Sequence, residues 1–257
     1  REENKKSISK EVVLTRDLIP LEETKAKGKA FEINGKRIAL INLPSFYYDP
    51  KTQEGATSDI LKVYNEIKSK GKIDAVVLDL RYDGGGVLDE AVKLVGIFVR
   101  EPVVVQIKSR GEVRKLRANT APQYISEPLI VAVNKYSASA SEIVAGAIKD
   151  YGRGIIVGDT STYGKGTVQS VNPKFRSMNL GAYKVTSAQF YTPDGASTQL
   201  KGVTSQIVIP SPSESRDIGE KNQRYAVEYN EVDSIFAKKN KSYFDDYLKD
   251  LQNLSKK

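Results

Sequence analysis

Apolar runs that end in a polar or glycine-rich turn and lead into an amphipathic segment recur through much of the chain. The almost continuous apolar run at 73–80 is typical of a strand buried on both faces of a parallel sheet, and further apolar runs predict strands at 129–133 and 154–158. Apolar positions with helical periodicity predict helices at about 57–69, at 88–98 and from Glu142 onward. Because strands alternate with helices, the pattern predicts an α/β fold with a largely parallel sheet.

Shorter alternating segments predict antiparallel hairpins on the flanks of this core. Asn34-Gly35 separates apolar segments at 31–33 and 37–43 and supplies the positive φ that a two-residue turn needs. Residues 44–48 leave this hairpin and are expected to form an exposed aromatic loop. A second hairpin is expected around Arg110-Gly111. The same criteria predict two further strands, at 181–191 and 207–209.

The two ends of the chain differ from the strand–helix pattern. A weak strand at 11–15 has no partner before it, so residues 1–16 are predicted to be the end of an upstream domain and its linker. The core is expected at 17–212. From Glu220 the pattern becomes helical and charged, and residues 213–257 are predicted to form a helical C-terminal appendage.

Histidine and cysteine are both absent from the 257 residues, which excludes whole classes of chemistry. A Ser-His-Asp triad, a cysteine nucleophile and a histidine-ligated zinc site cannot form within this chain. A serine nucleophile would need lysine, aspartate, glutamate or tyrosine as its base. We expect no metal ion and no other cofactor. The lack of cysteine does not distinguish cytosol from periplasm.

The formal net charge is +8, from 40 basic and 32 acidic residues. The lysines lie mainly near the two ends and are mixed with acids, which is typical of solvated surfaces. Basic and aromatic residues are not interleaved as in many RNA-binding surfaces, so we expect no nucleic-acid partner. No apolar run approaches the length of a membrane span.

Three serines alternate with alanines between the strand at 129–133 and the helix after it: Ser137, Ser139 and Ser141. A helix N-terminus carries unpaired N–H groups and the positive end of the helix dipole, which stabilise a developing oxyanion. The position therefore suits acyl transfer. The alternative interpretation is that these serines only cap the helix and form its turn.

Lys165 is the best candidate for a base, because it lies between Gly164 and Gly166 just after a buried strand and a short turn. A lysine in a free peptide has a pKa of about 10.4, and burial lowers this pKa, so that a neutral amine can accept a serine proton. Gln169 could accept a hydrogen bond from the amine and fix its direction. An exposed glycine turn is the alternative interpretation.

Gly84-Gly85-Gly86 joins a predicted strand to a predicted helix. Such a loop can present backbone N–H groups to an anion. The segment has neither the spacing of a dinucleotide-binding loop nor a following Lys-Ser/Thr pair, so phosphate binding is the weaker interpretation.

These segments, taken in order, resemble the C-terminal processing peptidases, also called tail-specific proteases. The resemblance spans roughly Leu14 to Pro210 and rests on several motifs: 44–47, 78–81, 84–86, 137–143, 150–153, 164–169 and 197–203. Several ordered motifs are far more specific than any one of them. The resemblance implies a ClpP/crotonase-like α/β core and a serine endopeptidase with a Ser/Lys dyad.

On this resemblance, Ser139 is the nucleophile, Lys165 is the general base and Gln169 orients the lysine. The backbone N–H groups of Gly86 and Ala140 would form the oxyanion hole. This agrees with the separate observation that one of them lies in a glycine loop and the other at a helix start. The remaining serines of the motif keep structural roles.

The resemblance also implies a PDZ domain that recognises substrate C-termini, and none fits before Glu11. The expected partners are unfolded proteins or proteins with exposed tails, membrane-associated proteins included, and the oligomeric state stays open. The resemblance places the chain in a bacterial periplasm or cell envelope. The alternative function is a catalytically degenerate module that holds extended C-terminal tails at a sheet edge.

Overall fold

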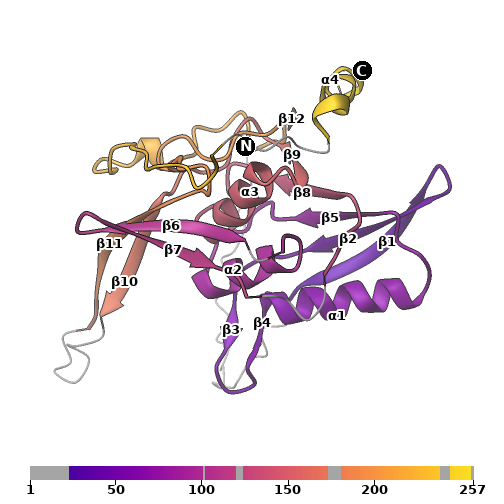
Figure 1. Cartoon of the computed structure of the whole chain (residues 1–257), viewed down its shortest axis with the longest axis horizontal. Coiled ribbons are helices and arrows are strands. Elements are labelled where there is room, and N and C mark those ends of the chain that lie inside the picture. Colours follow the sequence, from indigo (N-terminus) through magenta and orange to yellow (C-terminus); the bar gives the residue numbers. More distant parts are fainter. Residues whose placement is uncertain (1–22, 101, 120–123, 173–180, 238–243, 256–257) are drawn as a thin grey trace, which may run out of the picture.

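The computed structural model describes residues 23–100, 102–119, 124–172, 181–237 and 244–255. Within them, the central feature is a six-stranded sheet in the order β1-β2-β5-β8-β9-β12 (Figure 1). β1 (Lys27–Ile33) is antiparallel to β2 (Lys36–Asn42). The remaining neighbours are parallel, with β5 (Ala75–Asp79), β8 (Leu129–Val133), β9 (Gly154–Gly158) and β12 (Ile207–Val208). The predicted α/β fold with a largely parallel sheet is confirmed.

Helix α2 (Leu88–Gly96) contacts both α1 (Ala56–Ser69) and α3 (Ala140–Asp150), and the three helices share one core with the sheet. On β8, Ile130 is 37% exposed, whereas the alternate residues are buried: Leu129, Val131 and Val133. This strand is therefore buried on one face only. The helices cover the face to which the buried residues point, and the other face stays partly open.

A second, antiparallel sheet has the order β10-β11-β6-β7. Its strands are β10 (Thr167–Asn172), β11 (Tyr183–Tyr191), β6 (Val103–Ser109) and β7 (Glu112–Arg117). β3 (Tyr48–Asp49) and β4 (Glu54–Gly55) form a small separate hairpin. Both predicted hairpins, β1-β2 and β6-β7, are confirmed. β10 was not predicted as a strand, and in Figure 1 it extends together with β11 away from the main sheet.

Residues 44–48 form the predicted exposed aromatic loop only in part, because Tyr48 is 39% exposed whereas Phe46 is buried. Phe46 is 1% exposed, and its side chain belongs to the hydrophobic core. The Phe46 N–H donates to the carbonyl of Gly85 at 3.0 Å, and the Val87 N–H donates to the carbonyl of Phe46 at 2.7 Å. For Phe46 the prediction is wrong because this segment pairs with the distant glycine loop, and that pairing turns the ring into the core.

The C-terminal segment is helical only in part. η2 (Glu220–Asn222) is a short 3-10 turn and α4 (Asp245–Leu254) is a regular helix, whereas residues 223–237 are not helical. In the latter stretch the Val232 N–H donates to the carbonyl of Gly195 at 3.0 Å. The prediction of a helix from Glu220 onward is wrong here because hydrogen bonds to a distant turn replace those of a helix.

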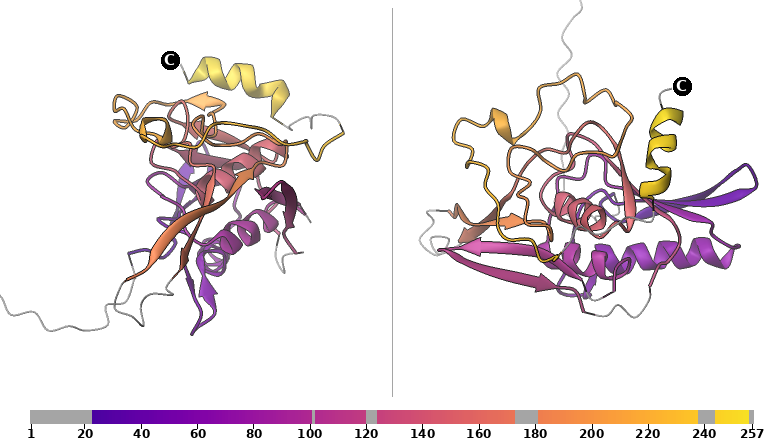
Figure 2. Two further views of the ribbon diagram at one scale, coloured as in Figure 1. Left: turned by 90° about the vertical axis from the view of Figure 1, so that its left-hand side faces the viewer. Right: turned by 45° about the horizontal axis from the view of Figure 1, so that its top comes forward.

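In both views of Figure 2 the yellow helix α4 lies at the outside of the fold. The predicted strand at 11–15, and with it the boundary at residue 16, lies outside the described residues. Within the described ranges, no helix is both long and apolar enough to cross a membrane.

Candidate active site

The strand-to-helix turn at Ser139 has an unusual backbone conformation. β8 ends at Val133, α3 begins at Ala140, and Ser139 just before the helix has φ 58° and ψ −110°. A positive φ is costly for a residue with a Cβ atom, and such strain gathers at functional sites. Ser139 is partly exposed and lines a cleft of about 440 Å³. The turn therefore presents this serine to an open site.

The two neighbouring serines hold the turn in place. The Ser137 hydroxyl donates to the carbonyl of Leu80 at 2.8 Å, and the Ser141 hydroxyl donates to the carbonyl of Asp83 at 2.9 Å. Both serines are fully buried. These bonds tie the turn to the end of β5 and to the glycine loop, which fits the structural role expected for both side chains.

The glycine loop after β5 packs directly against the same turn. Gly85 has φ 97° and Gly86 has φ 146°, conformations that L side chains rarely adopt. A Cβ atom on Gly85 would lie 2.8 Å from Cβ of Ser139 and 2.9 Å from the nitrogen of Ala140. One on Gly86 would lie 2.1 Å from the carbonyl oxygen of Phe46. Both positions therefore require glycine.

Two backbone donors remain available where the loop meets the turn. Among the described residues, the N–H groups of Gly86 and Ala140 have no hydrogen-bond acceptor. Both residues line the cleft. Ala140 is the first residue of α3, where unpaired donors and the helix dipole favour a negative charge. The junction can therefore bind an oxyanion.

Lys165 lines the same cleft from the segment between β9 and β10. Burial lowers its pKa from the usual 10.5, and the positive charge of Lys184 lowers it further, while Glu220 and Glu142 act in the opposite direction. The Lys165 Nζ donates to the carbonyl of Thr167 at 3.2 Å. The lowered pKa increases the fraction of neutral amine that can act as a base.

A buried carboxylate connects the turn at Ser139 with the loop at Lys165. Oε2 of Glu142 accepts the N–H of Ser139 at 2.8 Å and the N–H of Lys165 at 2.9 Å. Oε1 accepts the N–H of Gly164 at 2.7 Å and the hydroxyl of Thr162 at 2.6 Å. Burial raises the pKa of Glu142 to about 7, and these donors oppose the rise. One side chain thus sets the position of both segments.

Gln169 lines the cleft on β10, where the register with β11 shifts between Val168 and Gln169. Bulges of this kind re-aim a side chain. Among the described residues, no hydrogen bond joins Gln169 to the Lys165 amine, and none joins that amine to the Ser139 hydroxyl. The structure thus brings the three predicted side chains into one cleft, but without hydrogen bonds among them. Hydrogen bonds between catalytic groups often tighten only when substrate binds.

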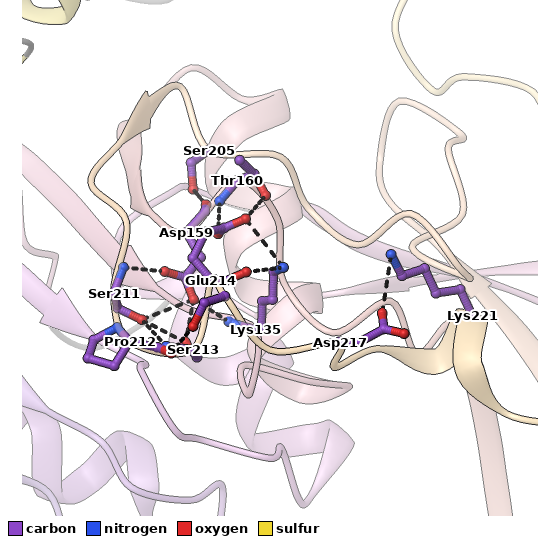
Figure 3. A network of polar contacts seen from close by, with 11 residues as sticks. Lys135, Asp159, Thr160, Ser205, Ser211, Pro212, Ser213, Glu214, Asp217 and Lys221 are labelled. Atoms are coloured by element: carbon purple, nitrogen blue, oxygen red, sulfur yellow. Dashed lines mark hydrogen bonds and ion pairs between the residues drawn. The ribbon is translucent and has the colours of Figure 1, made fainter.

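The segment between β9 and β10 is fastened by a buried aspartate (Figure 3). Asp159 accepts the N–H of Lys135 at 3.0 Å, the N–H of Ser211 at 2.8 Å and the hydroxyl of Ser213. Burial alone would raise the pKa of Asp159, but donors from Ser213, Ser211 and Lys135 together lower it. Figure 3 shows further members of this network: Thr160, Ser205 and Glu214.

Sequence reasoning identified the side chains of the cleft but missed those that hold them. The spacing of Ser139 and Glu142 is that of a capping box, a signal that could have pointed to Glu142. No comparable signal exists for Asp159, because its partners come from distant segments. A second hollow of about 460 Å³, between α1 and α2, contains none of the candidate residues.

Comparison with known proteins identifies the family. Residues 37–209 match the profile of peptidase family S41. Over 236 residues the chain is 38% identical to a tail-specific protease from Haemophilus influenzae, which covers 88% of this chain and 32% of that protein. Over 207 residues it is 35% identical to a carboxy-terminal-processing protease from Bartonella bacilliformis, which covers 79% and 44% respectively. The chain thus spans less than half the length of these relatives.

Solved structures agree with this match. The photosystem II D1 C-terminal processing protease superposes with a TM-score of 0.61 at 27% identity, over 72% of this chain and 48% of that one. A putative S41 protease from Bacteroides fragilis shares the fold, with a TM-score of 0.56 at 19% identity over 76% and 53% respectively. Fold and relatives define a protein of the serine peptidase class. The chain belongs to peptidase family S41, and the resemblance to C-terminal processing peptidases is confirmed.

Proposed function

We propose that this chain is the catalytic core of a serine endopeptidase that uses a Ser139–Lys165 dyad and cleaves proteins selected by their C-terminal tails. One observation carries the proposal: a single cleft contains a strained serine at a helix start, a lysine whose pKa is lowered by burial, and two N–H groups without acceptors. Relatives named as tail-specific and carboxy-terminal-processing proteases support the tail specificity.

In the proposed reaction, neutral Lys165 accepts the hydroxyl proton of Ser139 while Oγ attacks the carbonyl carbon of a peptide bond. The N–H groups of Gly86 and Ala140 bind the resulting oxyanion. When the tetrahedral intermediate collapses, the C–N bond breaks, the departing amine takes the proton from the Lys165 ammonium, and an acyl-enzyme remains. Water then gives a proton to neutral Lys165 and attacks the carbonyl carbon of the acyl-enzyme. When this second tetrahedral intermediate collapses, the bond between Oγ of Ser139 and that carbon breaks, Oγ takes the proton from the Lys165 ammonium, and the acid is released. We assign Gln169 the task of orienting the amine.

Strand β10 is suited to holding an extended substrate. It is an edge strand of the antiparallel sheet and lines the cleft with Thr167, Val168 and Gln169. Pairing with a sheet edge uses main-chain hydrogen bonds, and therefore accepts many sequences but only unfolded or flexible segments. This supports unfolded proteins and proteins with exposed tails, membrane-associated proteins included, as the substrates.

We further propose that the protein acts in the periplasm or cell envelope of a bacterium, together with a PDZ domain. The support for this location is the bacterial origin and the names of the relatives. Cell fractionation tests the location, and recovery of the protein in the cytoplasm alone contradicts it.

A module that binds tails without cleaving them is the second candidate. The observation that favours it is the lack of a hydrogen bond between Ser139 and Lys165 among the described residues. The two candidates differ in one measurable respect, because only the protease changes the length of its ligand.

The decisive experiment measures cleavage of an unfolded protein with a nonpolar C-terminus by the native chain, Ser139→Ala and Lys165→Ala. We expect cleavage by the native chain alone, with the Ser139→Ala unfolding temperature unchanged within about 2 °C. Cleavage by Ser139→Ala contradicts the dyad. If nothing is cleaved, and the native chain and Ser139→Ala bind a tail peptide equally in fluorescence anisotropy, the binding module is favoured.

A further inference from the structure

The glycine loop contains a buried carboxyl group that the proposed reaction does not use. Asp83 is 0% exposed. Its Oδ1 accepts the N–H of Gly85 at 2.8 Å, whereas its Oδ2 is buried without a hydrogen-bond partner among the described residues. A buried carboxylate is strongly disfavoured unless several donors or a cation compensate for the lost water. These surroundings therefore favour the neutral acid.

Asp83 touches both segments that meet at the proposed oxyanion site. Its carbonyl accepts the N–H of Ala138 at 3.0 Å and the hydroxyl of Ser141 at 2.9 Å. Its carboxyl holds Gly85, and a Cβ atom there would lie 2.9 Å from the nitrogen of Ala140. The carboxyl of Asp83 is thus hydrogen-bonded to Gly85, and the backbone of Gly85 packs against the N–H group of Ala140.

No neighbouring charge neutralises this carboxyl. Asp79 and Arg81, at the end of β5, pair with each other at 2.7 Å. Among the described residues, none of the charged groups on the adjoining elements forms a hydrogen bond or ion pair with the Asp83 side chain: Asp79, Arg81, Asp89, Glu90, Lys93, Lys135, Glu142 and Lys165. Burial raises the pKa of Asp83 to about 7, against the opposing effects of the Gly85 N–H and the Ser141 hydroxyl.

We propose that Asp83 is a positioning residue that acts as a neutral carboxylic acid, holding Gly85 while it is protonated and weakening catalysis when it ionises. The proposal rests on the proposed protease reaction. An ionised Asp83 would place a buried negative charge on the loop that carries the Gly86 N–H, and this charge would repel the developing oxyanion. Because Lys165 must lose its proton and Asp83 must keep its own, activity is confined to a window of pH.

The first test compares kcat/KM for the native chain and Asp83→Asn across pH with a tail-bearing peptide substrate. Asparagine keeps the shape and the acceptor for Gly85 but cannot ionise. We expect the ratio of Asp83→Asn to native kcat/KM to rise about tenfold between about pH 6 and about pH 9, whatever its starting value. Asp83→Ser, also neutral, should give the same trend. A ratio that stays constant or falls with pH in both variants overturns the proposal.

The second test is independent of proteolysis. The folded chain keeps the Asp83 proton up to about pH 7, whereas the unfolded chain loses it near 3.8, so the native chain should become less stable relative to Asp83→Asn over this interval. Urea unfolding at several pH values measures the difference in unfolding free energy between the native chain and Asp83→Asn. A difference that does not change with pH overturns the proposal that Asp83 is a neutral acid. If this stability difference appears while the native chain cleaves no substrate, the neutral state of Asp83 is supported, and only its proposed effect on catalysis is rejected together with the proposed function.

Discussion

The carboxylate of Glu142 and the backbone N–H of Lys165 are joined by a hydrogen bond of 2.9 Å, although 23 positions separate the two residues in the chain. The same oxygen accepts the N–H of Ser139 at 2.8 Å. The proposed nucleophile and base lie on separate segments, so their relative position depends on this buried side chain. Its place on α3, a regular helix in the core, keeps the arrangement rigid.

Glu142→Gln should reduce both stability and turnover. The glutamine amide keeps the shape of the side chain, but its NH₂ group would face N–H or O–H donors and cannot accept hydrogen bonds from them. Each lost hydrogen bond to a charged group costs about 1.5–3 kcal/mol. We expect a loss of about 2–4 kcal/mol in urea unfolding and a fall in kcat of about 100-fold, with KM little changed. Glu66→Gln, on the exposed face of α1, is the control. Equal kcat for Glu142→Gln and the native chain would contradict the positioning role.

Gly86→Ala should abolish most of the activity. A Cβ atom there would lie 2.1 Å from the Phe46 carbonyl oxygen, so the loop must move and carry its N–H away from the site. Loss of one oxyanion donor typically lowers kcat by about 10²–10³. Gly84→Ala is a matched control in the same loop, because a Cβ atom at Gly84 meets nothing within 4 Å. Equal losses in both variants would mean that the loop tolerates no side chain for some other reason.

Lys184→Gln should move the rising limb of the pH profile to higher pH. The positive charge of Lys184 lowers the pKa of Lys165, so removal of that charge raises the pKa and delays formation of the neutral amine. The measurement is kcat/KM as a function of pH at constant ionic strength, with Lys36→Gln, 68% exposed, as the control. A limb that stays in place or moves to lower pH would exclude Lys165 as the group that titrates.

Asp159→Asn should destabilise the chain more at neutral pH than in acid. The pKa of Asp159 is below its usual 3.8, so its contribution is present above that value and disappears as pH falls through the lowered pKa. We expect a loss of about 2 kcal/mol near neutral pH from the lost hydrogen bonds of the carboxylate, and a smaller difference in acid. Urea unfolding at several pH values, with the exposed Asp89→Asn as control, measures it. A difference independent of pH would assign the loss to packing.

The local pattern of the sequence determined much of this protein. Apolar runs predicted β5, β8 and β9, Asn34-Gly35 predicted the β1-β2 hairpin, and ordered motifs identified the family. These features succeed because strand burial, turn conformation and motif spacing depend on residues that are neighbours in the chain. The same local information selected the serine motif and Lys165, and the family resemblance selected Ser139 within the motif; the structure places Ser139 and Lys165 in one cleft.

Only the tertiary structure decided which groups hold that cleft together. Phe46 enters the core because its backbone pairs with Gly85, and residues 223–237 are not helical because they bond to a turn near Gly195. The carboxyl groups of Asp83 and Glu142 derive their raised pKa from burial. Burial and long-range hydrogen bonds depend on segments that meet only after folding, so neither periodicity nor spacing along the chain contains them.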